Sequence, residues 1–324
     1  GSSRNILMNL RQIRYFVTVA QERNFTRAAE ILHISQPPLS RQIQLLEETL
    51  GVNLFVRSSR PLRLTEAGKV FYEQAVQILS RVEQMKRSTQ QVGKNERHSL
   101  SIGFVPSMLY GGLPFLVKRL RLLRPHLSIQ LVELLSSQQP EALRTGLIDV
   151  GFGRLRLNFP DISRVVLREE RLMVVVPEEH PLAGPEDCPI ALTQLEKENV
   201  ILYPKEHRPN FGDSVLSMLR DHNFQPKNIQ EVSQLQTALG LVFANMGISI
   251  APVSIKGLRP DLCYRLLGDK SLTIPIILNY RTNDNTEIIE LMLDLLIDIY
   301  KEKHPWLDYS QHSLTVEKKI QYFL

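Results

Sequence analysis

The nine residues SQPPLSRQI, from Ser35 to Ile43, place two prolines at the front of an amphipathic helix. The first backbone N–H groups of a helix have no intrahelical acceptor, so prolines in this turn forfeit no helical hydrogen bond. With Ser35 as the N-cap, Pro37 and Pro38 take the second and third helical positions and stiffen the turn. The face expected to be buried consists of Leu39, Ile43, Leu46 and Leu50. Gly51 is expected to end the helix.

Two helices are predicted before this one, and a hairpin after it. LRQIRYFVTVAQERN (10–24) carries apolar residues at helical spacing, and TRAAEILHI (26–34) predicts a short helix with Thr26 as a possible N-cap. After residue 51, NLFVR (53–57) and LRLT (62–65) are short β-prone runs around the polar turn SSRP. Residues 8–65 are therefore predicted to form a winged helix-turn-helix domain.

Positive charge is concentrated in the same part of the chain. Residues 1–95 contain 14 Lys and Arg against 7 Asp and Glu, whereas the remaining residues contain 25 and 27. All of the excess positive charge lies in the first third, which indicates a polyanionic partner for that third.

A recognition helix presents its N-terminal residues to base edges in the major groove. Gln36 can pair with adenine, the proline rings can touch thymine methyl groups, and Arg41 can reach a guanine or a phosphate. Arginines of the hairpin, including Arg63, would neutralise phosphates, and Arg60 beside Pro61 could enter the minor groove. A lone arginine is often a solvated surface charge, but this grouping favours DNA contact. The predicted DNA-binding residues are Thr26, Ser35, Gln36, Pro37, Pro38, Ser40, Arg41, Arg57, Arg60 and Pro61.

A long helix is predicted from residue 66 to residue 93. Its apolar positions step alternately by four and three residues, which is a heptad spacing and favours helix pairing. The alternative is a helix packed against its own domain. The predicted dimerisation residues are Phe71, Ala75, Ile78, Val82 and Met85, with Thr89 and Val92 continuing the spacing. GKNERHS (93–99) predicts a polar linker.

Beyond the linker, strand-like and helix-like runs alternate. The order in residues 99–153 is βαβαβ, which predicts a parallel sheet with helices on its faces. A second set starts at RLMVVVP (171–177), and a last strand and helix, IPIILNY and EIIELMLDLLIDIYKE, return to the first set. We expect two lobes in residues 94–304: lobe I from about 99–168 and 272–304, and lobe II from about 169–271. A cleft between them is the default ligand site. The tail after residue 304 receives no assignment.

Several function classes are disfavoured by the sequence. It contains no P-loop, GxSxG, HExxH or GxGxxG motif, which argues against an enzyme. Cys188 and Cys263 stand far apart, so we expect buried free thiols, with no disulfide, metal or cofactor. The absence of an 18-residue apolar run argues against a membrane span. GSSRNIL before Met8 lacks a signal-peptide core, looks like an added leader and is left aside, and a cytoplasmic location is expected.

Residues 10–68 closely resemble the amino-terminal domain of LysR-type transcriptional regulators, and the resemblance extends to about residue 304. It implies an α/β multidomain protein with a winged helix-turn-helix, a linker helix and a two-lobed effector domain like periplasmic solute-binding proteins. It further implies a linker-helix dimer assembled into a homotetramer, operators that are imperfect palindromes of the T-N11-A type, and contact with RNA polymerase.

Within this family the chain looks most like the branch that responds to benzoate, muconate or chlorinated relatives. The resemblance is carried by PPLSRQIQLLEE (37–48), IGFVPSMLYGGLP (102–114), DVGFGRL (149–155) and LYPKEHRPNF (202–211). It implies an aromatic acid or dicarboxylate effector, which would be bound by Ser107, Met108, Ser136, Arg154 and Phe211. Two departures bear on the identity of the effector: Ser136 stands where close members carry threonine, and Pro106 replaces a small polar residue and lacks an N–H donor.

The residues themselves suit a carboxylate, because hydroxyls at strand ends and helix N-termini donate hydrogen bonds and Arg154 adds positive charge. Each also has a structural alternative: a helix cap for Ser107 or Ser136, an ion pair with an acid for Arg154, and core packing for Phe211. A DNA binder whose second domain only oligomerises is a further alternative that the sequence leaves open.

Overall fold

The computed structural model describes residues 7–94, 99–282, 284, 286–312 and 314. The chain divides into two compact units, Gly1–Asn95 and Glu96–Leu324, each of which has its own core. The predicted linker at residues 93–99 falls mostly outside the described residues.

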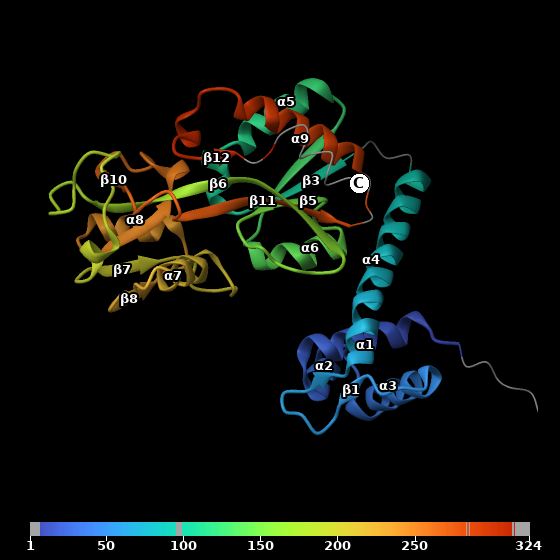
Figure 1. Cartoon of the computed structure of the whole chain (residues 1–324). Helices are drawn as coiled ribbons and strands as arrows, with labels where there is room; N and C mark the ends of the chain where they lie inside the picture. The colour runs from blue at the N-terminus through green and yellow to red at the C-terminus, as the bar shows by residue number, and fades with distance from the viewer. Residues whose placement is uncertain (1–6, 95–98, 283, 285, 313, 315–324) are drawn as a thin grey trace, which may run out of the picture. The chain divides into compact units, whose positions relative to one another are not determined.

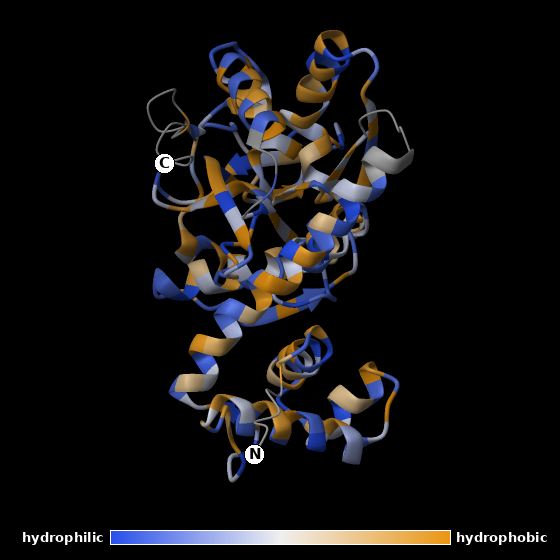
Figure 2. Ribbon diagram, turned by 90° about the vertical axis from the view of Figure 1, so that its right-hand side faces the viewer, coloured by the Kyte–Doolittle hydropathy of each residue, from blue (hydrophilic) through white to orange (hydrophobic). Residues whose placement is uncertain are grey.

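The first unit is a winged helix-turn-helix, as predicted. Its elements are α1 (Leu10–Glu22), α2 (Phe25–Ile31), α3 (Gln36–Leu50), β1 (Phe55–Val56), β2 (Arg63–Leu64) and α4 (Glu66–Lys94). β1 and β2 pair antiparallel and form the wing. The ring of Phe16 lies 5.2 Å from that of Phe55 and 4.9 Å from that of Phe71, so helix, wing and α4 share one core. Figure 2 shows the matching alternation of hydrophobic and hydrophilic residues along these helices.

The ends of these helices confirm some predictions and correct others. α3 begins at Gln36 with Ser35 at the N-cap position and prolines at its second and third positions, and Gly51 ends it with a φ of 72°. However, the Ser35 hydroxyl makes no capping hydrogen bond in the described part of the chain. The predicted N-cap of α2 was wrong, because Asn24 caps it by accepting the Arg27 backbone N–H at 3.0 Å.

The apolar face of α3 is shorter than predicted. Leu39, Ile43 and Leu46 are fully buried, whereas Leu50 is 36% exposed. Leu50 is the last helical residue, just before the left-handed Gly51, and the core does not extend that far.

The heptad positions of α4 fall into two groups. Phe71 and Ala75 pack into the core of their own domain, which is the alternative considered for this helix. Farther along, Val82 is half-buried, and Ile78 and Met85 are 41% and 62% exposed. The side chain of Val92 lies outside the described residues.

The second unit contains two lobes that share the long strand β6 (Ile162–Pro177) (Figure 1). In lobe I the strand order ends on the first part of β6 and is β4 (Ser128–Glu133), β3 (Ser99–Phe104), β5 (Val150–Gly153) and β11 (Thr273–Arg281). In lobe II the second part of β6 pairs on its two edges with β10 (Leu262–Leu266) and β9 (Ile248–Pro252), and β9 leads on to β7 (Asn199–Leu202) and β8 (Asn228–Glu231).

β6 passes from lobe I to lobe II close to the boundary expected at about residue 169, and it makes the sheet of lobe I mixed. The strand pairs with β11 up to Arg171 and with β9 from Leu172, so one strand passes from one lobe to the other. β3, β4 and β5 are parallel as predicted, but β11 runs antiparallel to β5 and β6. The charged residues Arg168 and Glu170 interrupt the apolar run of β6, so the sequence pattern predicted a strand only from residue 171 onward.

Helices cover the sheet in each lobe. Lobe I has α5 (Leu113–Leu123), α6 (Gln139–Thr145) and α9 (Thr286–Tyr300), and lobe II has α7 (Phe211–Asp221) and α8 (Leu235–Phe243). Short 3-10 helices lie in the connections: η1 (Pro106–Tyr110) and η2 (Ser136–Gln138) join a strand to a helix, whereas η3 (Leu192–Leu195) and η4 (Val253–Ile255) lie between two strands. α5 and α9 pack together against the apolar face of lobe I (Figure 1).

The structure gives part of the unassigned tail a place in the fold, and it corrects the prediction for the cysteines. After α9 the chain forms η5 (Pro305–Leu307) and β12 (Gln311–His312), which pairs with β6, so part of the unassigned tail belongs to the fold. Cys188 is exposed and Cys263 half-buried, so the prediction of two buried thiols was wrong. Among the described residues, no helix is both long and apolar enough to span a membrane.

The different burial of Leu46 and Leu50 gives a direct test of the α3 core. Leu46→Ala should lower the free energy of unfolding of the protein by about 2–5 kcal/mol, because it leaves a cavity. Leu50→Ala, the matched control, should change it by no more than about 0.5 kcal/mol, as expected at an exposed site. Urea unfolding followed by circular dichroism measures both, and equal losses would show that the core extends to Leu50.

Candidate DNA-binding helix and effector site

The N-terminal end of α3 is exposed, and its other side is anchored in the core. Gln36, Pro37, Pro38 and Arg41 are exposed and Ser40 is half-buried. The Thr26 hydroxyl donates to Oε1 of Gln36 at 3.1 Å, so a residue of α2 orients the first side chain of α3. The predicted base-contacting residues therefore share one accessible end of the helix.

The arginines of the wing form ion pairs and hydrogen bonds within their own domain that the sequence did not predict. Arg57 forms an ion pair with Glu47 of α3, whose buried carboxylate also accepts the Leu54 backbone N–H at 2.7 Å. Arg60 donates to the carbonyls of Arg57 and Ser59 at 2.7 and 2.9 Å. Sequence reasoning missed Glu47, although an acid on the buried face of a helix signals a partner of this kind.

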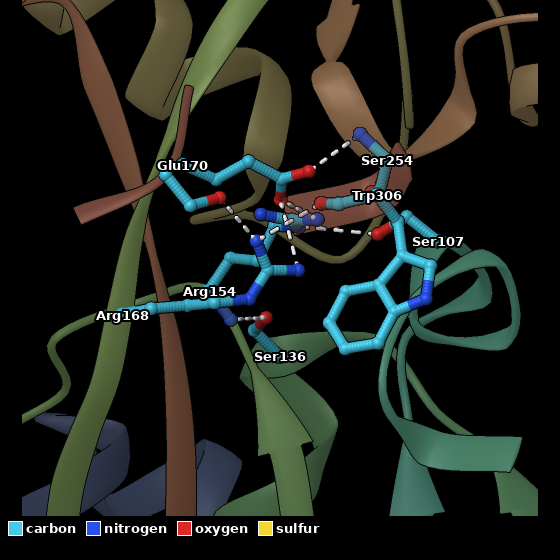
Figure 3. Close-up of polar contacts among 8 residues, drawn as sticks. Ser107, Ser136, Arg154, Arg168, Glu170, Ser254 and Trp306 are labelled. Carbon is cyan, nitrogen blue, oxygen red and sulfur yellow. Dashed lines mark hydrogen bonds and ion pairs between the residues drawn. The ribbon is translucent and has the colours of Figure 1, made fainter. Parts of the chain in front are cut away.

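A second cluster of polar side chains lies in the effector unit, around Arg154 (Figure 3). Arg154 follows β5 and is only 3% exposed. Its Nε donates to Oγ of Ser107 at 3.1 Å, and its backbone N–H donates to Oγ of Ser136 at 3.0 Å. Gly153 permits this approach, because a Cβ there would lie 3.0 Å from Ser136 Oγ. Three of the predicted effector residues are thus brought together.

Glu170 of β6 completes this cluster, and sequence reasoning missed it. Its Oε2 accepts from Nη2 of Arg154 at 2.9 Å and lies 3.9 Å from Nη2 of Arg168. Its Oε1 accepts the backbone N–H of Ser254 of lobe II at 2.5 Å. The alternative considered for Arg154, an ion pair with an acid, is therefore what the structure shows.

The environment of Glu170 keeps it ionised. Burial acts to raise the pKa of Glu170, but the charges of Arg154 and Arg168 and the hydrogen bonds from Ser254 and Arg154 outweigh it, so the pKa is lowered from its ordinary value. The carboxylate links β5 and β6 to η4, and so links lobe I to lobe II.

A small cavity adjoins this cluster. Ser107, Met108, Arg154, Arg168 and Ser254 are among the residues that line it. Within the part of the chain that the structure describes, Nη1 of Arg154 and Oγ of Ser254 are buried without a hydrogen-bond partner. Unpaired buried donors beside two guanidinium groups favour an anion, and a carboxylate above all.

Phe211 and Ser136 stand apart from this cavity. Phe211 begins α7, is half-buried and lies 5.2 Å from the ring of Tyr203. Neither Phe211 nor Ser136 lines the cavity. Next to Ser136, the Ser137 hydroxyl donates to the His207 carbonyl at 2.6 Å, so the loop before α7 contacts lobe I.

Residues 10–69 match the bacterial regulatory helix-turn-helix proteins of the lysR family, and residues 93–300 match the LysR substrate binding domain. The chain belongs to the LysR family of transcriptional regulators. The two matches account for both units of the fold and confirm the resemblance that the sequence carries.

Individual relatives cover nearly the whole chain. The chain is 52% identical over 301 residues to a probable cat1 operon transcriptional activator of Acinetobacter lwoffii, covering 93% of this chain and 99% of that protein. It is 43% identical over 294 residues to the regulator BenM of Acinetobacter baylyi, covering 90% and 96%. These relatives are transcriptional regulators, which confirms that the chain is not an enzyme.

Among solved structures, the effector binding domain of BenM with its effector benzoate matches with a TM-score of 0.60 at 38% identity, covering 65% of this chain and 98% of that one. Full-length CbnR in complex with its target DNA matches with a TM-score of 0.56 at 30% identity, covering 89% and 99%. The predicted branch of the family is confirmed by the match to a regulator of which benzoate is the effector.

Removal of the Glu170 charge should destabilise the effector unit. Glu170→Gln leaves Arg154 and Arg168 buried without a counterion, at a cost of about 3–5 kcal/mol in the free energy of unfolding. Glu169→Gln, at the neighbouring half-buried site that pairs with Arg156, should cost about 0–1 kcal/mol. Urea unfolding at neutral pH measures both, and equal losses would contradict the role given to Glu170.

The same pair predicts a dependence on pH. Because the pKa of Glu170 is lowered on folding, its stabilising effect is present above its ordinary value of 4.5 and is lost as pH falls through the folded value. Between about pH 5 and pH 3, wild type should therefore lose more stability than Glu170→Gln.

Proposed function

We propose that this regulator controls its DNA binding through a small carboxylate, an aromatic acid or a dicarboxylate, that binds between the two lobes at Arg154. The observation that carries this proposal is the buried Nη1 of Arg154, which has no hydrogen-bond partner within the described residues and lies beside Ser107 and Ser254. A carboxylate would supply the missing acceptor. The benzoate effector of BenM, a 43% identical relative, supports this chemical class.

Binding of such an effector requires movement. The cavity holds about one water molecule, whereas pockets for small ligands are usually several hundred Å³. The lobes are joined by β6 and β11, and the Glu170 contacts to Arg154 and Ser254 hold them together at this point. An effector that displaces or reorients Arg154 would therefore change how the lobes pack. Its affinity would then differ between the two lobe arrangements, which is the condition for a ligand to shift the population from one to the other.

The DNA partner is proposed to bind the exposed end of α3 and the wing. CbnR has been solved with its target DNA, and the exposed positions of α3 match the contacts expected of a recognition helix. Exposed Ile78 and Met85 on α4 support pairing of two chains through that helix. We infer a homodimer that assembles to a tetramer on a T-N11-A type operator in the cytoplasm and contacts RNA polymerase there.

Substitutions at the end of α3 test the DNA contact. Arg41→Ala and Gln36→Ala should each weaken operator binding by about 1–3 kcal/mol, and Gln36→Ala should also relax sequence preference. Arg259→Ala, which removes an arginine paired with Asp261 in the effector unit, is the matched control and should leave operator affinity unchanged. Fluorescence anisotropy on the operator measures all three, and unchanged binding by both α3 variants would rule out this helix as the reader.

Calorimetry with benzoate and cis,cis-muconate tests the effector site. Ser107→Ala removes the acceptor of Arg154 Nε and a cavity-lining hydroxyl, so it should weaken binding by about tenfold, or 1.4 kcal/mol. Ser163→Ala removes a half-buried hydroxyl that bonds Thr282, outside the cavity lining, and should not change affinity. If wild type binds neither compound at millimolar concentration, the second domain is better explained as an oligomerisation module.

A further inference from the structure

The segment that follows α9, residues 304–311, lies across both lobes of the effector unit; we call it the C-terminal strap. On the lobe I side, Trp306 is buried and its ring lies 5.7 Å from that of Phe115 and 6.3 Å from that of Tyr300. A Cβ on Gly112 would lie 3.2 Å from the indole, so the glycine makes room for Trp306. This end of the strap is part of the core of lobe I.

The middle of the strap holds Arg168 of β6 (Figure 3). The guanidinium carbon of Arg168 lies 5.2 Å from the centre of the Trp306 ring. Its Nη1 donates to Oγ of Ser310 at 2.7 Å and to the Trp306 carbonyl at 3.4 Å. β12 then pairs with β6 beside the same arginine. Arg168 therefore donates hydrogen bonds to the strap, its side chain also hydrogen-bonds Tyr300 of α9, and its charge lies 3.9 Å from Glu170.

The strap also contacts lobe II. Lys256, which follows η4, donates to Asp308 at 2.7 Å and to Glu186 at 3.0 Å. The Tyr309 hydroxyl donates to Glu186 at 3.1 Å, and its ring packs on the apolar core of lobe II. η4 is the same short helix whose Ser254 N–H binds Glu170. The strap thus contacts Arg168 on the lobe I side of the Glu170 cluster and Lys256, next to η4, on its lobe II side.

From these contacts we infer that the C-terminal strap is a positioning and coupling element: it restrains the two lobes against each other and holds Arg168, so that the state of the effector cleft and the attachment of the strap depend on one another. β6 and β11 are the covalent crossings between the lobes, and two adjacent strands permit hinge rotation about themselves. The strap adds a noncovalent tie from Trp306 to Lys256, which such a rotation must stretch or break.

A route from the strap to the cleft is present in the contacts. Arg168 and Arg154 share one oxygen of Glu170, and only Arg154 is within hydrogen-bonding distance of it. Ser310 and Trp306 keep Arg168 at the longer distance. Loosening of the strap would let Arg168 compete for that oxygen and so change the hold of Glu170 on Arg154, the residue of the proposed effector site.

The restraint is tested without any ligand. The double variant Asp308→Ala, Tyr309→Phe removes the hydrogen bonds of these two strap residues to lobe II, at side chains outside the cavity lining. In the full chain, hydrogen exchange should be about fivefold faster or more in residues 134–138 and 203–211, which face each other through Ser137 and His207. Asp261→Asn, which removes an ion pair within lobe II, should leave these rates unchanged. Unchanged hydrogen exchange in the double variant would overturn the proposal that the strap restrains the lobes.

The coupling to the effector rests on the proposed function and has its own readout. Benzoate should change the exchange protection of residues 304–311, and the double variant should change the benzoate dissociation constant by about fivefold or more. Linkage fixes the relative sign: if benzoate lowers strap protection the variant must bind more tightly, and if benzoate raises it the variant must bind more weakly. Binding with no change in either quantity, or with opposite signs, overturns the coupling. Failure of wild type to bind benzoate would instead count against the effector, and the ligand-free exchange test would still decide the restraint.

Discussion

The effector unit depends on one buried carboxylate. Glu170 is completely buried, and an ion in that position is stable only if every oxygen is compensated. Its partners come from three places in the chain: Arg154 after β5, Arg168 on β6 itself, and the backbone N–H of Ser254 in lobe II. Removal of any one leaves charge or a polar group uncompensated, so the contact between the lobes and the shape of the cavity are set by the same ion. A buried ion pair adds little net stability over a well-packed apolar core, and here its partners join lobe I to lobe II.

Local patterns predicted most of the fold. Helical periodicity located α1, α3 and α4, because each has an apolar stripe and a polar opposite face. β6 was missed in its first half, since Arg168 and Glu170 lie in the interior without breaking the strand, and a buried charge looks like a loop residue to any rule based on hydropathy. The direction of β11 and the pairing of β12 could not be predicted for another reason. Both strands pair with residues about a hundred or more positions away in the sequence, and a local sequence pattern carries no information on such pairings.

The candidate site was predicted in part. The resemblance supplied Ser107, Ser136 and Arg154, and the structure brings them together, but nothing in the sequence joined them to Glu170 or Ser254. Ion pairs form between residues that the fold makes neighbours, so their partners follow only from the topology. Trp306 is the same case: a lone tryptophan in a polar tail has no periodic signal, yet it packs on α5 and α9 and covers Arg168.

The two anion-binding surfaces proposed for this chain are built on opposite principles. At the end of α3 and on the wing the arginines are exposed, and two prolines occupy the one turn of the helix that has no hydrogen bonds to lose. In the proposed DNA complex, affinity would come from solvated charges that release counterions. At Arg154 the cation is desolvated and its Nη2 is already paired with Glu170, so the proposed ligand would bind the remaining donor, Nη1. Salt screens exposed charges strongly and buried pairs weakly. Operator affinity should therefore fall steeply as salt rises while effector affinity changes little, so the effector response can be read at a salt concentration chosen for the DNA.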